Sequence, residues 1–508
     1  MANRNANPDL AWLWPEKGRN QEALRDAVRD IQSPYEVAPP PMCYPGTMLD
    51  KALLRHASLL MAMQINSIGS HTHVEFDDDG QMTVRIGEGG FDQVQRMERE
   101  ALWMIASTLG AKPTEIDGYF CGGGTEANIE GLWIGREYLR RCPDPFNKGI
   151  CVFTTPLQHY SIAEACRILD LDRDNFVRCT KCQEDHIFRP DVRGCGLNFV
   201  GMNVKGEMDI GSLRKEYEKK FAEGFRQFLI VPTVGTTVMG SIDPIALIGD
   251  MIRAEHQNAN FYMHIDASFA GFTVPFVDPH GRHFFQVPEV MSVTVDADKM
   301  GRLPYPAGVF LCRKGLMSNV ARKVNYVRGG LDDTISGSRS CLAPVLAWYL
   351  YQAEGREGQR EYVQRCLDQR DRFLDLIKSD HDLNWVRPLP HSPFVNLAPL
   401  MLDFPFYRDG FRGIPPLITE TPDPQKVTDE TRPIAGLLEP YHLRRDFFPS
   451  DPYDVSSCPR YVYKFCIMPH HQFHDSKNPK ADVDFHLKTF LTKLKFAYSY
   501  WYKLKEAS

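Results

Sequence analysis

The sequence predicts an α/β protein with a large domain built on a mostly parallel sheet and a smaller α+β domain at its C-terminus. Two observations support this prediction. Between Phe91 and about residue 345, short apolar runs alternate with segments of helical spacing, which is typical of parallel strands joined by helices. Beyond residue 345 the pattern changes to a long helical segment, proline-rich stretches and one late apolar run. We therefore expect an N-terminal arm with short helices over 1–90, a large domain over 91–345 and a small domain over 346–508.

The elements of the large domain can be predicted in chain order. Apolar residues at Val94, Met97, Leu102 and Ile105 predict a helix that stops near Gly110. The next segments indicate strand, glycine turn and helix (GYFCGGGTEANIEGLWIGREYLRR), then strand, loop and helix (ICVFTTPLQHYSIAEACRILDL). Three further apolar runs end in polar residues: FRQFLIVPTVGTT, FYMHIDASF and VMSVTVDAD. Because ligands gather at the carboxyl ends of parallel strands, the polar residues that end these runs are the candidates for chemistry.

The C-terminal region has its own pattern. A stretch from APVLAWYLYQ to FLDLIKS predicts one long helix or two helices in succession. Proline-rich segments follow, then a strand (RYVYKFCIMPHHQF) and a final helix (DVDFHLKTFLTKLKFAYSYWYKL). Together these elements predict the smaller α+β domain.

Composition narrows the class of protein. The 508 residues include 59 basic and 65 acidic side chains, which gives a formal net charge of −6. This mild acidity argues against a nucleic-acid binder, and no run of about 18 apolar residues suggests a membrane span. The N-terminus is polar and interrupted by proline, unlike a secretory signal. We therefore expect a cytoplasmic protein with a small-molecule partner.

The thirteen cysteines are an odd number spread along the chain, which favours reduced thiols over a disulfide framework. Cys179 and Cys182 form a C-x-x-C pair with His186 nearby, and Cys195 is the only other thiol close in sequence. A structural zinc site usually needs four ligands, so we expect no metal.

Three motifs could carry chemistry. The glycines of Gly122 to Gly124, followed by Thr125 and a helix, could let the backbone approach an anion, although a tight turn that binds nothing is the ordinary alternative. Asp266 ends an apolar run, where a buried carboxylate needs a cationic partner or serves as a helix cap or turn residue. Lys299 follows another such run and is a candidate imine-forming amine, although most lysines are solvated surface groups.

The combination is more specific than its parts. An anion site, a buried carboxylate and a strand-end lysine, in that order, are what pyridoxal phosphate (PLP) requires for its phosphate, its pyridinium nitrogen and its aldehyde. His159 lies between the first two in sequence and could stack on a cofactor ring, whereas a lone histidine is more often structural. The TVGTT segment, which begins at Thr233, could add further contacts.

The motifs resemble those of the group II PLP-dependent amino-acid decarboxylases. The matching segments are CGGGTEAN, QHYS, PTVGTTVMGSIDPI, HIDASFAGF, SVTVDADKMG, DDTISGSRS and YKFCIMPH. DTISGSRS and IMPHH look most like the tyrosine and histidine decarboxylases of that family. The resemblance implies an aspartate-aminotransferase-like fold (PLP fold type I), a seven-stranded sheet, PLP as cofactor and a homodimer with the active site at the interface.

The resemblance also implies roles for individual residues. Lys299 would form the Schiff base, Asp266 would pair with the pyridine nitrogen and His159 would stack on the ring. Contacts to the cofactor would also come from Gly124, Thr125, Thr233, Ser268 and Ser338, the last from either subunit. Tyr326 would return a proton after decarboxylation, and substrate contacts would come from His71, His73 and Lys464.

Two positions depart from the family pattern. The residue before the lysine is usually histidine and here is Asp298, whose charge would repel a phosphate by about 4 kcal/mol at 4 Å. We therefore expect Asp298 to point elsewhere or to have another partner. Lys464 replaces an arginine that binds the substrate carboxylate, and lysine lacks the bidentate fork.

The sequence therefore predicts decarboxylation of an aromatic, tyrosine-like L-amino acid to its amine and carbon dioxide. Two alternatives remain at this point. One is a carbon–carbon lyase of the sphingosine-phosphate-lyase type, and the other is a homologue without catalytic activity. Release of carbon dioxide would indicate the decarboxylase, whereas release of an aldehyde would indicate the carbon–carbon lyase.

Overall fold

The structure is a computed structural model of the 508-residue chain. It describes the following residues: 42, 51–63, 65–72, 74–76, 82–84, 92–171, 176–178, 185–188, 196–278, 280–325, 331–402, 416–419, 424–449, 451–454, 459–468 and 483–506.

A seven-stranded sheet forms the centre of the large domain, in the order β3-β11-β10-β9-β8-β4-β7. Its strands are β3 (Ile116–Cys121), β4 (Ile150–Thr154), β7 (Leu197–Phe199), β8 (Gln227–Ile230), β9 (Asn260–Asp266), β10 (Val290–Asp296) and β11 (Gly308–Arg313). Only β11 runs against the others, because it pairs antiparallel with both β10 and β3. The expectation of a mostly parallel, seven-stranded sheet is confirmed.

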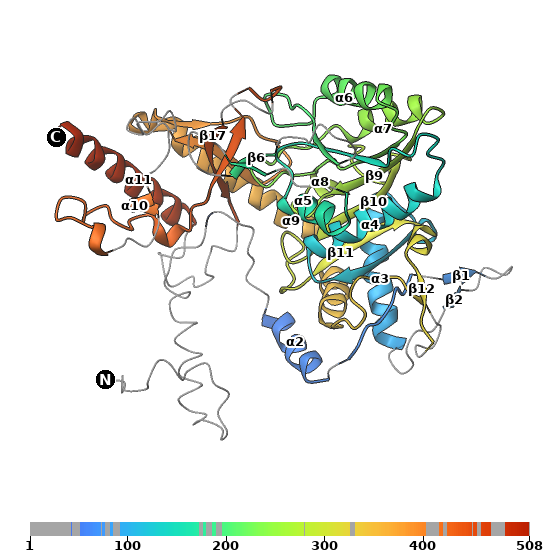
Figure 1. The fold of residues 1–508 in the computed structure, drawn as a ribbon. Helices are drawn as coiled ribbons and strands as arrows, with labels where there is room; N and C mark the ends of the chain where they lie inside the picture. Colours follow the sequence, from blue (N-terminus) through green and yellow to red (C-terminus); the bar gives the residue numbers. More distant parts are fainter. Residues whose placement is uncertain are drawn as a thin grey trace, which may run out of the picture.

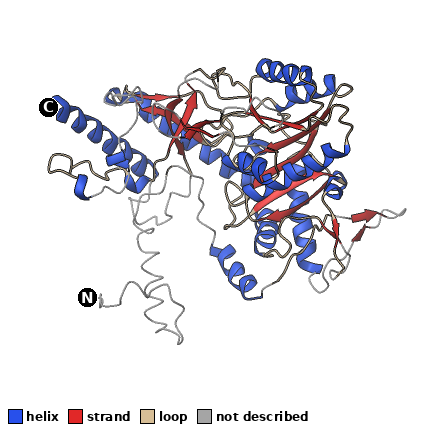
Figure 2. Cartoon of the chain, in the orientation of Figure 1, coloured by secondary structure: helices blue, strands red, loops and turns tan. Residues whose placement is uncertain are grey.

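Helices cover both faces of this sheet (Figures 1 and 2). The helices of the large domain are α2 (Lys51–Met63), α3 (Asp92–Thr108), α4 (Gly124–Arg141), α5 (Tyr160–Ile168), α6 (Ile210–Ala222), α7 (Ile245–Glu255) and α8 (Val274–Val277). Side chains of β3 alternate between the two faces, as the pleat requires. Ile116 and Phe120 pack in the same apolar cluster as α3, whereas Tyr119 and Cys121 pack in the cluster of α4 and α5.

The C-terminal region forms a four-stranded antiparallel sheet of order β14-β15-β17-β16 with a final helix, at the left of Figure 1. Its elements are β14 (Val386–Pro388), β15 (Leu397–Leu402), β16 (Arg445–Pro449), β17 (Pro459–Cys466), α10 (Pro416–Thr419) and α11 (Val483–Glu506). The predicted late strand and final helix are therefore present. An apolar cluster around Phe373, Phe465 and Phe490 fills this region.

A 38-residue helix, α9 (Leu342–Ser379), joins the two regions. It has non-helical dihedrals at Gly355 (φ 64°), so both forms of the prediction, one long helix or two in succession, describe part of it. Leu367 still packs in a cluster of the large domain, whereas Phe373 packs in the C-terminal cluster. The helix thus carries the chain from one core to the other well after residue 345, and the boundary there stays a prediction.

Among the described residues, three pairs of short strands lie outside these two sheets and were not expected from the sequence. Short hairpins are formed by β1 (Val74–Phe76) with β2 (Met82–Val84) and by β5 (Phe176–Arg178) with β6 (Asp185–Phe188), and β12 (Arg322–Lys323) pairs with β13 (Leu331–Asp332). In the N-terminal region, Leu53 and Ala57 of α2 are buried in the large-domain core. Helix α2 is therefore packed on the large domain, whereas Met42 packs in the C-terminal cluster.

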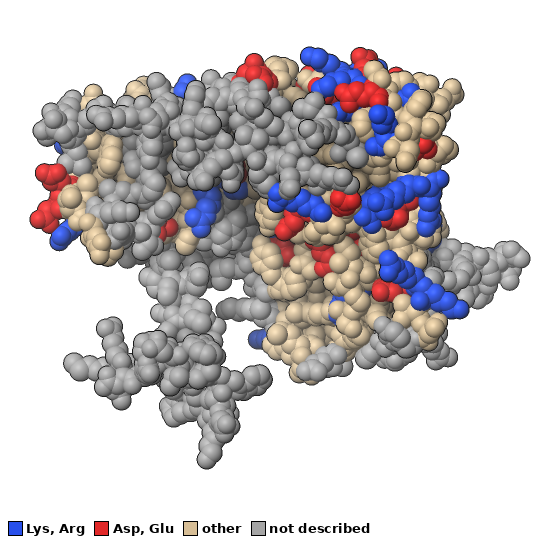
Figure 3. All heavy atoms as spheres, viewed as in Figure 1, with Lys and Arg blue, Asp and Glu red and all other residues tan. Residues whose placement is uncertain are grey.

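Two observations concern nucleic acids and membranes as partners: the distribution of surface charge and the length and polarity of the helices. On the face seen in Figure 3, basic and acidic side chains of the described residues lie side by side. Among the helices described, none is long and apolar enough to cross a membrane.

Candidate active site

The predicted lysine lies in the turn that follows β10, next to the carboxylate that ends the strand. Nζ of Lys299 donates a hydrogen bond of 2.6 Å to Oδ2 of Asp296, and their side chains are 23% and 6% exposed. Burial lowers the pKa of Lys299, but Asp296 and, more weakly, Asp266 and Asp298 outweigh it, so that the net shift is upward. The amine is thus held as an ammonium ion in this arrangement.

Asp266 ends the neighbouring strand β9 and is 3% exposed. Its Oδ1 accepts hydrogen bonds from the backbone N–H of Ser268 (3.1 Å) and from the Ser268 hydroxyl (2.7 Å). Its Oδ2 accepts one from Nδ2 of Asn128 on α4 (3.1 Å). These three donors are neutral, so a cationic partner such as a protonated pyridine nitrogen would complete the charge balance of the carboxylate.

A buried chain of polar side chains extends from Asp266 through α4 and into the sheet. Oδ1 of Asn128 lies 3.0 Å from Nε2 of His264, whose Nδ1 lies 2.7 Å from the hydroxyl of Ser292. Tyr262 donates to the same hydroxyl at 2.9 Å. Burial lowers the pKa of His264 to about 4, so the ring is neutral. Sequence reasoning missed Asn128 and His264 as positioning residues, although both stand inside the motifs that it selected.

His159 caps the N-terminus of α5 and faces the same site. Its Nδ1 lies 2.8 Å from the Ser161 hydroxyl and accepts from the Ser161 N–H at 3.4 Å. Burial lowers the pKa of His159, with opposing contributions from nearby charges. The charges that reach it belong to Asp266, Lys299, Asp296 and Lys464. The structure therefore brings four predicted site residues into one electrostatic environment: His159, Asp266, Lys299 and Lys464.

The three consecutive glycines form the turn between β3 and α4. Gly123 has φ 142°, and Gly124 is the first residue of the helix. A Cβ at position 124 would lie 2.5 Å from Oγ of Ser268 and 2.7 Å from Oδ2 of Asp296. The turn is therefore pressed against the ends of β9 and β10. The first amides of α4, near Thr125, face this region, which places the positive end of the helix dipole there.

These residues fit pyridoxal phosphate by their chemistry and placement. β3, β9 and β10 run in the same direction, so the glycine turn, Asp266 and Lys299 come together at one edge of the sheet. Lys299 would supply the amine for the aldehyde, Asp266 would supply an anion for the ring nitrogen, and the N-terminus of α4 would suit the phosphate. Because Gly124 has no Cβ, the N-terminus of α4 can lie close to Ser268 and Asp296 at the ends of the strands.

Two other predicted residues have clear positions in this chain. Thr233 is bridged to Asp266 in the sheet, and its N–H donates 2.7 Å to Asp243. The backbone of Thr233 therefore lies beside that of Asp266. Ser338 is exposed, and its Oγ accepts from Asn66 at 3.3 Å. The contribution of Ser338 to a phosphate site thus stays a prediction, either within this chain or to a partner subunit.

The predicted substrate residues, together with the predicted proton donor Tyr326, divide into three groups. His71 is 3% exposed and lies 3.0 Å from the Ser67 hydroxyl and 3.5 Å from Glu98, within a buried network that includes Arg339. Lys464 lies on β17 and acts on His159 electrostatically. His73 and Tyr326 lie outside the described residues, so their roles stay predictions.

Asp298 has another partner, as expected from its charge. Its Oδ2 accepts a 3.0 Å hydrogen bond from the N–H of Ala307, and its side chain is buried. Burial and the neighbouring Asp296 raise the pKa of Asp298 to about 6. The carboxylate therefore ties the lysine turn to the segment that leads into β11.

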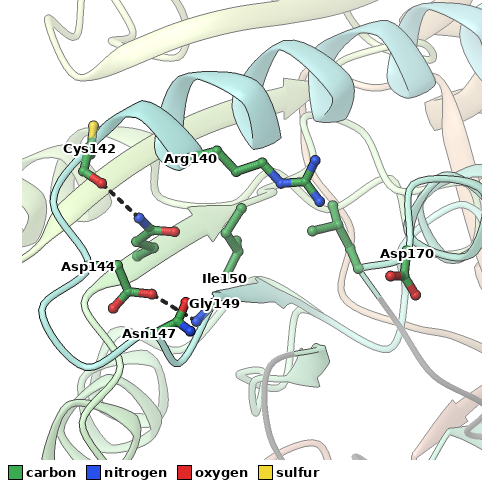
Figure 4. Close-up of a pocket in the computed structure, with 9 residues that line it drawn as sticks. Arg140, Cys142, Asp144, Asn147, Gly149, Ile150 and Asp170 are labelled. Atoms are coloured by element: carbon green, nitrogen blue, oxygen red, sulfur yellow. Dashed lines mark hydrogen bonds between the residues drawn. The ribbon is translucent and has the colours of Figure 1, made fainter.

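A pocket of about 410 Å³ lies at the opposite edge of the sheet (Figure 4). Its lining includes Ile150 at the start of β4, Gln227 at the start of β8, and Arg140 near the end of α4. Because the candidate catalytic residues follow the ends of parallel strands, this pocket is separate from them. Among the described residues, no group of three or more His, Cys, Asp or Glu side chains is arranged to hold a metal ion. The C-x-x-C pair lies outside them.

A mostly parallel sheet with a lysine amine, a buried carboxylate and a glycine-bounded helix N-terminus at one edge defines a PLP-dependent enzyme of the aspartate-aminotransferase-like fold. Residues 147–395 match the pyridoxal-dependent decarboxylase conserved domain. The chain is 31% identical over 316 residues to a probable L-tyrosine/L-aspartate decarboxylase of Methanopyrus kandleri, covering 60% of this chain and 73% of the relative. The chain belongs to this family, the group II PLP-dependent decarboxylases.

Two further comparisons agree. A tryptophan decarboxylase of Clostridium sporogenes is 29% identical over 349 residues, which cover 67% of this chain and 74% of the relative. The solved glutamate decarboxylase of Lactobacillus brevis has the same fold, with a TM-score of 0.66, 16% identity and 97% of each chain covered. The protein is therefore a PLP-dependent amino-acid decarboxylase, which favours carbon dioxide release over the carbon–carbon lyase and non-catalytic alternatives.

Proposed function

We propose that this decarboxylase converts an aromatic, tyrosine-like L-amino acid into its amine and carbon dioxide, with Lys299 as the residue that carries the cofactor. The observation that supports the site is the shared environment of Lys299, Asp266 and His159 at one edge of the sheet. The support for an aromatic substrate is the tryptophan and probable tyrosine/aspartate specificity named for relatives at 29% and 31% identity.

The chain's own residues divide the work as follows. When bound, PLP supplies an electron sink for the bond that breaks at Cα. Asp266 keeps the ring nitrogen protonated, because its carboxylate is fixed by Ser268 and Asn128 and lacks a cationic donor among these bonds. The neutral His159 ring offers a flat surface beside the same space. Lys299 would hold the cofactor through its amine, which is the group that the substrate amine would replace.

Lys464 is the proposed partner of the substrate carboxylate. It stands on β17, opposite Pro399 of β15, and its charge reaches His159. A single ammonium ion gives one strong contact without the fixed geometry of a guanidinium fork. Because decarboxylation requires the carboxylate to leave as neutral carbon dioxide, a weaker hold on its charge does not oppose the step.

The test is a substrate survey of the purified, PLP-loaded protein with the twenty amino acids, followed by mass detection of amines. We expect tyramine or tryptamine as the main product, with carbon dioxide released in equal amount. Lys299→Ala should lose both the absorbance near 420 nm and amine formation. Release of an aldehyde in place of carbon dioxide, or amines from non-aromatic substrates alone, would contradict the proposal.

The homodimer and the cytoplasmic location also remain proposals. The exposed Ser338, on a segment whose family role is phosphate binding, is consistent with donation of a residue to a second subunit. Light scattering on the full chain should give twice the 58.0 kDa chain mass. A monomer with full activity would rule out a shared active site.

A further inference from the structure

Asp296 occupies a position between the lysine amine and the N-terminus of α4. Its Oδ2 accepts the 2.6 Å hydrogen bond from Lys299. The same oxygen would lie 2.7 Å from a Cβ on Gly124, the first residue of α4. A negative charge therefore already stands at the helix end where we place the phosphate of the cofactor.

Strand register holds Asp296 in this position. Asp296 pairs with Gly308 of β11, and Gly308 pairs on its other side with Cys121 of β3. A Cβ on Gly308 would clash with the backbone of Gly123, so the glycine turn rests directly on this strand. Because three adjacent strands fix the spacing, the backbone of Asp296 is held next to the N-terminus of α4.

The second oxygen of Asp296 has no neutralising contact. Oδ1 is buried and, among the described residues, has no hydrogen-bond partner. The side chain as a whole is 6% exposed. The titratable groups that face Asp296 from the packed elements are Lys299, Asp266, His159, Asp298 and Cys121. Burial raises the pKa of Asp296, even though the Lys299 ammonium ion opposes that shift.

We propose that Asp296 must take up a proton before an anion can bind at the N-terminus of α4, so that cofactor loading is coupled to the uptake of one proton. In the cofactor-free protein the carboxylate pairs with Lys299. An arriving phosphate brings a second negative charge to the same buried place, and the neutral carboxylic acid is the form that tolerates it and can donate a hydrogen bond to it. The proposal rests on placing the phosphate at Gly124 and Thr125, and not on the substrate.

The sign of the effect follows from linkage. If the bound state holds one more proton than the free state, anion affinity falls as pH rises, by about tenfold for each pH unit above the pKa of the carboxyl group. The alternative is that an anion pairs directly with the Lys299 ammonium ion and displaces Asp296. That exchange takes up no proton and predicts an affinity that does not follow the titration of Asp296.

Sulfate is a suitable probe, because its charge is constant across the neutral range. With the full chain stripped of cofactor, the inhibition constant of sulfate is measured by competition with PLP binding, followed near 420 nm, between pH 6 and pH 9. The wild-type constant should rise at least tenfold across this range. In Asp296→Asn the rise should be largely lost, and at pH 8 sulfate should bind at least tenfold more tightly than to the wild type.

Asp298→Asn is the matched control, since it removes a buried negative charge two residues away whose partner is the Ala307 N–H. It should keep the wild-type pH dependence. A pH-independent wild type, an Asp296→Asn protein with the wild-type slope, or a slope lost in Asp298→Asn alone would overturn the proposal. So would a failure of sulfate to compete at any pH.

A second measurement needs no substitution and covers the case in which Asp296→Asn does not fold. Sulfate is added to the cofactor-free wild type at pH 8 in weak buffer with an indicator dye. Uptake of about one proton per sulfate bound is expected from the linkage. Binding of sulfate without proton uptake would favour direct pairing with Lys299 and end the proposal.

Discussion

Gly124→Ala tests whether the glycine turn is the close-approach point of the site. The sequence shows three equivalent glycines, but the structure separates them. A Cβ at position 124 would lie 2.5 Å from Oγ of Ser268 and 2.7 Å from Oδ2 of Asp296, both of which are held by hydrogen bonds of their own. A Cβ at position 122 would meet only the far end of the flexible Glu126 side chain, at 2.8 Å.

The magnitude can be worked from these contacts. Overpacking of a tight site costs about 1–3 kcal/mol. Replacement of a helical glycine by alanine returns about 0.5–1 kcal/mol. The net loss of unfolding free energy in Gly124→Ala should therefore be about 1–2 kcal/mol. Because the clash displaces Ser268 or Asp296, the affinity for PLP should fall as well, by about tenfold or more for each 1.4 kcal/mol of strain carried into the bound state.

Urea unfolding and titration with PLP near 420 nm measure the two effects separately. Gly122→Ala is the matched control, and its unfolding free energy should stay within about 0.5 kcal/mol of the wild type with unchanged PLP affinity. Equal effects of the two substitutions would refute the placement of Gly124 against the ends of β9 and β10. A Gly124→Ala protein with full stability and full PLP affinity would refute it also.

Three further predictions concern charged groups. Asp266→Asn should still bind PLP but lose at least about 100-fold in kcat, because a neutral amide does not keep the ring nitrogen protonated; an unchanged kcat would contradict this. Lys464→Ala should raise KM for the amino acid at least about tenfold and leave PLP affinity as it was, and a change confined to PLP affinity would count against it. Burial raises the pKa of Asp243 to about 7 from 3.8, so the folded state prefers the protonated carboxyl. The contribution of Asp243 to the unfolding free energy should thus be fully present below about pH 4 and fall by up to about 4 kcal/mol as pH rises to 7. Compared with the wild type, urea unfolding of Asp243→Asn should lack this fall, and an equal pH dependence would refute the assignment.

The parts of the fold that the sequence predicted are those with strong local signals. Apolar runs that end in polar residues identified β3, β4, β8, β9 and β10, and the helical spacing after Phe91 identified α3. Strand order and register depend on contacts far apart in the chain. The reversed strand β11 and its pairing between β10 and β3 could not be read from local pattern, although this pairing brings Gly308 of β11 against Gly123.

The same distinction applies to the site. Lys299 and Asp266 could be selected from the sequence because Asp266 ends one strand and Lys299 closely follows the end of the next, at the edge where ligands bind. The difference between Asp296 and Asp298 could not, because both flank the same alanine in one short turn. Sequence reasoning treated Asp298 as the residue of interest, whereas the structure pairs Asp298 with a backbone N–H and Asp296 with the lysine. Direction of a side chain in a turn depends on the strand that lies opposite, here the Gly308 end of β11.

The hydrogen-bond chain behind Asp266 explains why its carboxylate stays an acceptor. Nδ2 of Asn128 donates to Asp266, so the amide oxygen faces His264, whose Nε2 must carry the hydrogen. Nδ1 of the neutral ring is then an acceptor for the Ser292 hydroxyl, which in turn accepts from Tyr262. Each member has its donor and acceptor assigned by its neighbour, so the orientation of the Asn128 amide is fixed from within the sheet. A carboxylate fixed by neutral donors on one side has its remaining capacity directed toward the site, where a cationic ring nitrogen would satisfy it.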